Sequence, residues 1–465
     1  MHRVKLPGRE LFAEDGALLS SILMENGVPH DHPCGGKGTC KKCLITVNGE
    51  KVLSCQYKIH SNIEVEPSES EKIFSETGAE IGGKAEGRLA FALDIGTTTL
   101  ALALVALDTQ KIVRVVTETN PQRAFGADIM SRIGHCMKNG PLEMHSVLIA
   151  KINEMIADFA LHEEIPLYAA GNATMLHLFF NIDCSSIGTA PYTPVFLEEK
   201  HASGKDLALN SVSEVIALPS IASFVGADLV AGLNYVGLPE NCKYNILADL
   251  GTNAEIILFS KDKVLSTAAA AGPCFEGANI SCGMSATKGA IYRYEKDGSY
   301  KTIGDAEATG ICGTGLIDVM AALLANETVD FTGYMEEEEY VLAENVSLTQ
   351  EDIRQYQLAK SAVCSAMMTL MDMAGIGEES IGTLYISGGF SAKIDRENAA
   401  RTGLLPEILK DRISAISNSS LLGTVKFACE KNDLSVFLEN AEYADLSQSK
   451  RFSDLFMENM FFGEE

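Results

Sequence analysis

The chain has 465 residues, and its 37 basic and 63 acidic side chains give it a formal net charge of −26. This charge argues against nucleic acid and anionic membranes as partners, because both present phosphates. Apolar residues make up 46% of the chain, but no stretch approaches the roughly 20 apolar residues of a membrane span and the first residues lack a secretory signal, so we expect a cytoplasmic protein.

Residues 1–66 are predicted to form a small domain. After a short extended entry, residues 17–26 place four apolar side chains on one helical face. Residues 44–53, "LITVNGEKVL", are typical of two strands joined at Asn48 and Gly49, since Asn-Gly is the strongest short signal for a hairpin. A compact sheet with one helix is therefore expected.

The small domain contains four cysteines with the spacing C-x5-C-x2-C-x11-C, namely Cys34, Cys40, Cys43 and Cys55. Three lie in a glycine-bearing loop, and the fourth follows the predicted hairpin. If Val47 pairs with Glu50, Cys43 lies opposite Ser54, and Cys55 lies diagonal to Cys43 on the side of the loop. The spacing therefore predicts that the four thiols converge.

Four thiolates suit either zinc or an iron–sulfur cluster. Zinc sites usually contain two C-x2-C pairs, and this sequence has one, which favours a 2Fe-2S cluster. The arrangement resembles ferredoxins of the plant and adrenodoxin type. That resemblance implies a β-grasp, ferredoxin-like domain.

Residues 67–88, "PSESEKIFSETGAEIGGKAEGR", are predicted to be a flexible linker. They are rich in serine, glutamate and glycine and contain few apolar residues. A flexible segment of this length would span roughly 25 Å root-mean-square, which would let the small domain move.

The rest of the chain contains a repeat. "LDIGTTT" at 93–99 and "ADLGTNA" at 248–254 each place an aspartate, a glycine and a threonine after an apolar run. Such a strand-turn-strand unit suits phosphate, because glycine permits close approach, amides and hydroxyls meet phosphate oxygens, and the aspartate can hold Mg2+ through water. The residues concerned are Asp94, Gly96, Thr97, Thr98, Asp249, Gly251, Thr252 and Asn253. Two related α/β halves facing a cleft are expected.

Two later glycine stretches complete the set, at 310–318 with Gly313 and at 386–391 with Gly388 and Gly389. The four motifs together resemble the actin, hexokinase and Hsp70 superfamily of ATPases over residues 89–430. The resemblance implies a duplicated ATPase fold with subdomains at 89–243 and 244–430 and a C-terminal extension at 431–465. It also implies that Asp94 and Asp249 lie near Mg2+ and that Gly388 and Gly389 pack beneath the adenosine of ATP.

Further stretches are more specific: "GNATMLHLF" from 171, "FVGADLVAGL" from 224, "AAGPCFEGANISCGM" from 270 and "ATGICGTGLID" from 308. They resemble the ATPase domain of the reductive activators of corrinoid proteins, which also carry an N-terminal 2Fe-2S domain. Larger members have a further domain after the linker. Here Arg88 leads almost directly into the first turn, so we expect a compact form.

This resemblance implies a function. The cluster would supply an electron at roughly −400 mV, which is too high for efficient reduction of a Co(II) corrinoid, so ATP turnover would drive the transfer that restores Co(I) in a methyltransferase system. Glu255 is the candidate for orienting the attacking water. Ser281, with Ser285 as the alternative, is the candidate corrinoid contact. The expected partners are a corrinoid protein and an upstream low-potential electron donor, and a homodimer is expected from the superfamily.

Two alternatives with an active role for ATP stay open at this point, and a third is non-enzymatic. One is an ATP-driven electron donor to another low-potential metalloenzyme. The other is a small-molecule kinase of the same superfamily with a redox-sensing iron–sulfur domain, although no acceptor pocket with a positioned base is evident in the sequence. In the third alternative, the nucleotide has only a structural role and the chain is a redox-gated binding module.

Overall fold

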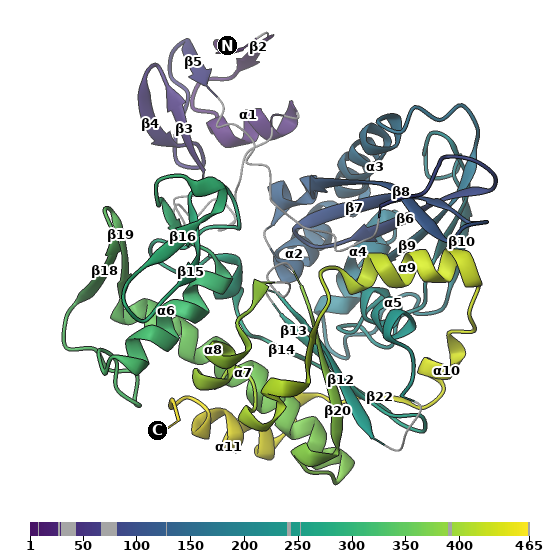
Figure 1. The fold of residues 1–465 in the computed structure, drawn as a ribbon. Helices are drawn as coiled ribbons and strands as arrows, with labels where there is room; N and C mark the ends of the chain where they lie inside the picture. Colours follow the sequence, from purple (N-terminus) through teal and green to yellow (C-terminus); the bar gives the residue numbers. More distant parts are fainter. Residues whose placement is uncertain are drawn as a thin grey trace.

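The computed structural model of the chain describes residues 1–7, 9–26, 28, 43–66, 81–126, 128–239, 243–251, 253–388 and 393–463. Figure 1 shows a small N-terminal sheet and two larger halves, each built on a six-stranded sheet. In these ranges, no helix is both long enough and apolar enough to cross a membrane.

The N-terminal sheet has the strand order β2-β1-β5-β3-β4. One helix, α1, buries Leu19 and Leu23 against the sheet, where Val4, Ile59 and Val65 are also fully buried. The predicted compact sheet with one helix is therefore present. Its elements are β1 (His2–Leu6), β2 (Arg9–Ala13), α1 (Leu19–Glu25), β3 (Leu44–Val47), β4 (Glu50–Leu53) and β5 (Ile63–Glu66).

The first large half contains a sheet of order β10-β11-β9-β6-β7-β8. Its central strands are apolar on both faces, as expected for strands covered by helices on each side. The elements are β6 (Leu89–Ile95), β7 (Thr99–Ala106), β8 (Lys111–Thr119), α2 (Ile129–Asn139), α3 (Leu142–Ala157), β9 (Ile165–Gly171), α4 (Ala173–Phe179), β10 (Lys200–Ser203), β11 (Val212–Ala217) and α5 (Ala227–Val236).

The second large half contains a sheet of order β21-β20-β12-β13-β14-β22, with a three-stranded sheet and a hairpin inserted between its strands. The elements are β12 (Tyr244–Leu250), β13 (Ala254–Phe259), β14 (Val264–Ala269), β15 (Ala290–Tyr294), β16 (Tyr300–Thr302), β17 (Gly310–Ile311), α6 (Gly313–Ala325), β18 (Glu339–Ala343), β19 (Val346–Thr349), α7 (Gln350–Ala374), β20 (Ile381–Ser387), α8 (Arg396–Arg401), β21 (Ile413–Ala415), α9 (Ser419–Glu430), α10 (Ser435–Leu438), β22 (Ala441–Tyr443) and α11 (Lys450–Glu458).

The two six-stranded sheets repeat one pattern. In each, the first strand (β6 or β12) pairs antiparallel with the second, the second pairs antiparallel with the third, and the first pairs parallel with a later strand (β9 or β20). The duplication predicted from the two aspartate motifs is therefore confirmed.

Helix α9 connects the halves. It follows β21 of the second sheet, yet it packs against α5, β6 and β9 of the first half. In Figure 1 this yellow helix lies beside α5, among the blue and teal elements of the first half. The chain therefore crosses from one half to the other immediately before α9, so the two halves share this helix.

Two segments are more integrated than the sequence indicated. Residues 81–83 fall in the predicted linker, but Ile81 forms a bridge with Ile112, and the amides of Gly82 and Gly83 donate to the Ile112 carbonyl. An edge strand such as β8 offers unpaired backbone groups, so these residues belong to the first sheet's edge rather than to a free linker. Likewise, the predicted C-terminal extension supplies β22 to the second sheet, and α11 packs on α7.

Candidate functional site

A cavity of about 650 Å3 is lined by residues of both large halves. The turn between β6 and β7 and the turn between β12 and β13 both open into it, so the two repeated motifs meet at one site. Ten of the predicted site residues line this cavity: Asp94, Gly96, Thr97, Thr98, Asp249, Gly251, Asn253, Glu255, Gly313 and Gly388. Thr252 and Gly389 lie outside the described residues.

The first turn is closed by backbone and side-chain hydrogen bonds. The Gly96 amide donates to the Thr99 carbonyl over 3.0 Å, and the Asn120 side-chain amide donates to the Gly96 carbonyl over 2.8 Å. A Cβ atom on Gly96 would lie only 2.6 Å from the Thr99 oxygen, so glycine is required here. Asn172, the N-cap of α4, donates to the Thr97 hydroxyl over 3.2 Å. The turn therefore presents a fixed set of amides and hydroxyls.

A buried arginine lies behind this turn. The Arg132 side chain is 0% exposed, and it donates to the Thr97 carbonyl over 2.5 Å and to the Gly126 carbonyl over 3.0 Å. Within the described residues no carboxylate forms an ion pair with it; its other hydrogen bonds are with Gln122 and Met175. Burial lowers the pKa of Arg132 to about 9, so it is still charged at neutral pH. A positive charge is thus fixed directly behind the first turn.

The second turn is shaped by close packing. The Gly251 amide donates to the Asn253 carbonyl over 3.0 Å. Gly388, at the end of β20, has a φ of +112°, and a Cβ atom there would lie 2.4 Å from the Leu250 carbonyl oxygen. Any side chain would strain the backbone and displace the turn. Gly388 therefore lets β20 approach the second turn as closely as it does.

Asp94 is tied to the connecting helix. Asn418, the N-cap of α9, donates to one Asp94 carboxylate oxygen over 2.9 Å, and the Ser420 hydroxyl donates to the other over 2.7 Å. Burial raises the pKa of Asp94 even though both hydrogen bonds favour its charged form. The first turn is thereby linked to the helix through which the chain passes between the halves.

Other acids also line the cavity, and Asp249, Glu255 and Asp228 are three of them. Glu255 lies directly opposite Asp249 on β13, so the two side chains share one face of the sheet. Burial, followed by the charges of Asp94 and Glu276, raises the pKa of Asp249 to about 7. Burial and the neighbouring acids also raise the pKa of Glu255 well above its ordinary value.

Asp228 is the third of these acids, and sequence reasoning missed it. It lies in the first turn of α5, and burial together with Asp249 raises its pKa to about 7. Its only local signal is an acidic residue two positions after a glycine, at the start of an apolar helix. Such a residue also suits a solvent-exposed helix start, because acids are favoured in the first turn.

These acids lie close together, and a divalent cation would favour their ionised forms. In the described part of the chain, no three His, Cys, Asp or Glu side chains are arranged to ligate one ion directly. Mg2+ is usually bound in part through water and phosphate oxygens.

Helix α6 points its N-terminus at the cavity. It begins at Gly313, where a Cβ atom would lie 2.2 Å from the Phe275 carbonyl oxygen, so only glycine fits. Its N-cap, Cys312, donates to the Ile291 carbonyl over 3.3 Å and contacts the Thr314 hydroxyl at 3.4 Å. Cys312, Gly313 and Thr314 all line the cavity. The structure therefore assigns Gly313 to the cavity wall.

The two candidate serines differ in position. Ser285 lines the cavity, whereas Ser281 is exposed and is not among the lining residues. Both the amide and the hydroxyl of Ser281 donate to one carboxylate oxygen of Asp352, over 2.7 and 3.1 Å. Asp352 also forms the capping box of α7 with Thr349. Ser281 is therefore fixed to the start of α7, outside the cavity.

The cysteine hairpin has the predicted register. Val47 pairs with Glu50, and the Ser54 amide donates to the Cys43 carbonyl over 2.9 Å. Cys43 and Cys55 are both buried, and their Sγ atoms are 3.2 Å apart. Cys34 and Cys40 lie outside the described residues. Two of the four predicted ligands are thus brought together.

Two family models match nearly all of the chain beyond the small domain. One, described as the RACo middle region, matches residues 89–241, and the other, described as the C-terminal domain of RACo, the ASKHA domain, matches residues 243–465. The region called the middle of RACo corresponds here to the first half of the duplicated fold.

Proteins similar to the chain include two curated proteins and one solved structure. The "Corrinoid activation enzyme RamQ" of Eubacterium limosum is 26% identical over 582 aligned residues, covering 98% of each chain. The "[Co(II) methylated amine-specific corrinoid protein] reductase" of Methanosarcina barkeri is 27% identical over 410 residues, covering 79% of this chain and 75% of that protein. A structure described as "Reductive activator for corrinoid,iron-sulfur protein" has a TM-score of 0.73 at 25% identity, covering 99% and 98% of the two chains.

These similarities establish the fold of the two large halves, which is the ASKHA, actin-like ATPase fold expected from the sequence. The 582 aligned positions shared with RamQ exceed the 465 residues of this chain, so that relative contains residues without a counterpart here.

Proposed function

We propose that this chain, most of which matches the two RACo models, is an ATP-dependent reductive activator that returns the Co(II) of a corrinoid protein to Co(I) in a methyltransferase system. The observation that carries the proposal is that one chain contains both a converging cysteine hairpin and a two-turn carboxylate cavity. It matches a reductive activator of a corrinoid protein over nearly its whole length. Neither part alone would point to this function.

The cysteine hairpin fits a 2Fe-2S cluster. Two thiolates on one tetrahedral metal, at about 2.3 Å from it, are about 3.8 Å apart. The sulfurs of Cys43 and Cys55 are 3.2 Å apart. They need to move apart only slightly to reach the spacing of two ligands on one metal. We propose that Cys34 and Cys40 complete the set, and the five-stranded sheet with its single helix supports a ferredoxin-like domain. When bound, a cluster of this type supplies single electrons at low potential.

The cavity suits Mg-ATP. The amides and hydroxyls of the first turn, with Arg132 behind them, favour phosphate oxygens. Asp228 and Asp249 are the residues that would hold Mg2+, and its charge would return both carboxyls to their ionised form. We propose Glu255 as the group that orients the attacking water, because it lies opposite Asp249 in the same cavity.

Hydrolysis can be coupled to movement between the halves. Asp94 contacts α9 from the first turn, and α9 packs against both α5 and β6. A change in the phosphates at that turn would therefore alter the position of the helix that joins the halves. We propose that this change is transmitted to a docked corrinoid protein and that Ser281 or Ser285 contacts it. We also propose an upstream low-potential electron donor and a homodimer.

The test is an anaerobic electron-transfer assay. The reduced protein is mixed with a Co(II) corrinoid protein from the same cell, and visible spectra are recorded with and without Mg-ATP. We expect the Co(I) spectrum only when Mg-ATP is present. If Co(II) persists with every corrinoid protein of that cell, the proposed function is wrong.

A matched pair of cysteine variants locates the electron path. Cys43→Ser removes a proposed cluster ligand, whereas Cys429→Ser changes a cysteine in α9 that is not among the cavity-lining residues. We expect the first variant to lose Co(I) formation while retaining ATP binding, and the second to resemble the parent protein. Equal activity of the two variants would remove the hairpin from the path.

A further inference from the structure

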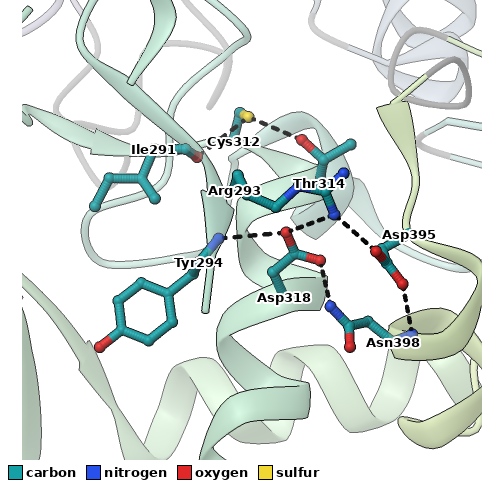
Figure 2. A network of polar contacts seen from close by, with 8 residues as sticks. All are labelled: Ile291, Arg293, Tyr294, Cys312, Thr314, Asp318, Asp395 and Asn398. Carbon is teal, nitrogen blue, oxygen red and sulfur yellow. Dashed lines mark hydrogen bonds and ion pairs between the residues drawn. The ribbon is translucent and has the colours of Figure 1, made fainter. Parts of the chain in front are cut away.

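A buried ionic network lies beside the cavity in the second half. Asp318 of α6 is 1% exposed, and it accepts hydrogen bonds from the Asn398 side chain over 2.7 Å and from the Tyr294 amide over 3.3 Å. The Arg293 guanidinium lies 3.3 Å from Asp318 and 2.9 Å from Asp395, the N-cap of α8. Figure 2 shows Arg293 between the two carboxylates. The network therefore joins β15, α6 and α8.

The sequence neighbours of these charged residues line the cavity. Tyr292 precedes Arg293 on β15, Lys393 lies two residues before Asp395, and Thr314 lies one helical turn before Asp318 on α6. The Lys393 ammonium lies 5.6 Å from the centre of the Tyr292 ring. Arg293, Asp318 and Asp395 do not themselves line the cavity. The network therefore fixes the spacing of one wall of the cavity.

This wall differs chemically from the rest of the site. The repeated turns at the ends of the six-stranded sheets present glycines, hydroxyls and carboxylates, which suit phosphates and Mg2+. The wall built from the three-stranded sheet and the segment before α8 presents the Tyr292 ring, the Lys393 cation and the apolar Ile303. The Lys393 cation lies over the Tyr292 ring, and aromatic rings and cations are both groups that a planar, nitrogen-rich base contacts through its π-face.

We propose that Asp318 is a positioning residue that fixes Tyr292 and Lys393 in the part of the cavity wall where the base of the nucleotide binds. The proposal rests on the nucleotide site of the proposed function and adds the residues that recognise the base. Asp318 acts through Arg293, because without its carboxylate the guanidinium keeps only Asp395 and can turn toward it. Tyr292 would then lose the backbone anchor that Asp318 provides at Tyr294.

The experiment compares two ligands by isothermal titration calorimetry in the presence of Mg2+: ATP, which has a base, and inorganic tripolyphosphate, which does not. We expect Tyr292→Ala to weaken ATP binding by about 5- to 100-fold, the range found for loss of one stacking aromatic, and Tyr292→Phe to restore it. Asp318→Asn should weaken ATP binding by about tenfold. Neither change should alter tripolyphosphate binding.

Lys360→Met is the matched control. Lys360 is also a buried charged residue of the second half at 1% exposure, but its ammonium donates to the carbonyls of Asn459 and Phe461, away from the cavity. It should lower thermal stability without changing the ratio of ATP to tripolyphosphate affinity. A thermal melt of each variant confirms that it is folded under the titration conditions.

The outcomes are distinct. If Asp318→Asn weakens ATP and tripolyphosphate equally, its role is only structural and the proposal is wrong. If Tyr292→Ala leaves ATP affinity unchanged, the base does not stack there, and the proposal is again wrong. No corrinoid protein is present in this assay, so it can succeed even if the proposed electron transfer fails, whereas binding of neither ligand would overturn the nucleotide site itself.

Discussion

The two repeated turns have the same strand-turn-strand pattern, but they are held in place differently. The first is supported by polar contacts: Arg132 donates to Thr97 from behind, and both oxygens of Asp94 accept hydrogen bonds from the start of α9. The second is supported by close packing at Gly388, and its aspartate lies among other acids. Duplication of a motif therefore does not imply duplication of its role.

This contrast suggests a division of labour. Asp94 is occupied by α9 and suits a mechanical role between the halves, whereas Asp249 faces Asp228 and Glu255 and suits cation binding and catalysis. The buried Arg132 lies behind the first turn, and the cluster of acids lies near the second. A phosphate chain bridged by Mg2+ would match both ends of this gradient.

The largest expected effect tests this division directly. Asp249→Asn should lower kcat for ATP hydrolysis by about 100- to 1000-fold, as loss of one preorganised electrostatic group commonly does. Asp94→Asn should lower it by about tenfold or less, because asparagine retains the shape and an acceptor for Ser420 or Asn418. Steady-state phosphate release measures both. Equal losses in the two variants would show that the aspartates share one role.

An intermediate effect is expected from pH and Mg2+ at the second turn. The pKa values of Asp228 and Asp249 are raised from 3.8 to about 7 in the folded protein. The folded state therefore binds more protons than the unfolded chain between about pH 4 and 7, and this contribution to stability is lost as pH rises through that window. We expect the cation-free protein to have a higher Tm at pH 5.5 than at pH 8.

Mg-ATP should reverse this trend, because the cation favours the ionised carboxylates and releases protons on binding. Asp249→Asn should reduce the difference in Tm between the two pH values, since asparagine does not titrate there. The measurement is a thermal melt at both pH values, with and without Mg-ATP. A Tm of the cation-free protein that is higher at pH 8 would contradict the raised pKa values.

Local patterns in the sequence predicted the parts of the site that local structure determines. The repeated turns, the Asn48-Gly49 hairpin and the register that joins Cys43 to Cys55 each depend on a few consecutive residues. Asp228 and Arg132 depend instead on where their helices pack. Each is a charged residue within a helix, which on its own is more often solvated than buried.

Contacts between distant parts of the chain account for the rest. Asn418 and Asp94 are 324 residues apart, and nothing in either segment indicates their pairing. The same holds for the C-terminal segment, whose backbone carbonyls at Asn459 and Phe461 accept from the buried Lys360. An acidic segment with few motifs appears peripheral until its backbone partners are known.

The smallest expected effect compares the same position in the two turns. In Gly96→Ala the new Cβ would lie 2.6 Å from the Thr99 carbonyl oxygen, a backbone atom that cannot move without opening the turn. In Gly251→Ala the nearest atom is a Glu276 side-chain oxygen at 3.3 Å, which can move by rotation about flexible bonds. The first substitution should therefore cost about 1–3 kcal/mol of unfolding free energy, and the second less than about 1 kcal/mol.

Thermal melts of the two alanine variants would measure this difference, and Mg-ATP titrations would show whether it reaches the site. Because the first turn is supported by hydrogen bonds from Asn120 and Asn172, a distorted Gly96 would also misplace the Thr97 hydroxyl. We therefore expect the Gly96 variant to bind Mg-ATP more weakly than the Gly251 variant. If instead the Gly251 variant bound Mg-ATP more weakly, the second turn would be the more rigid phosphate support. The mechanical role would then belong to the second turn and not to the first.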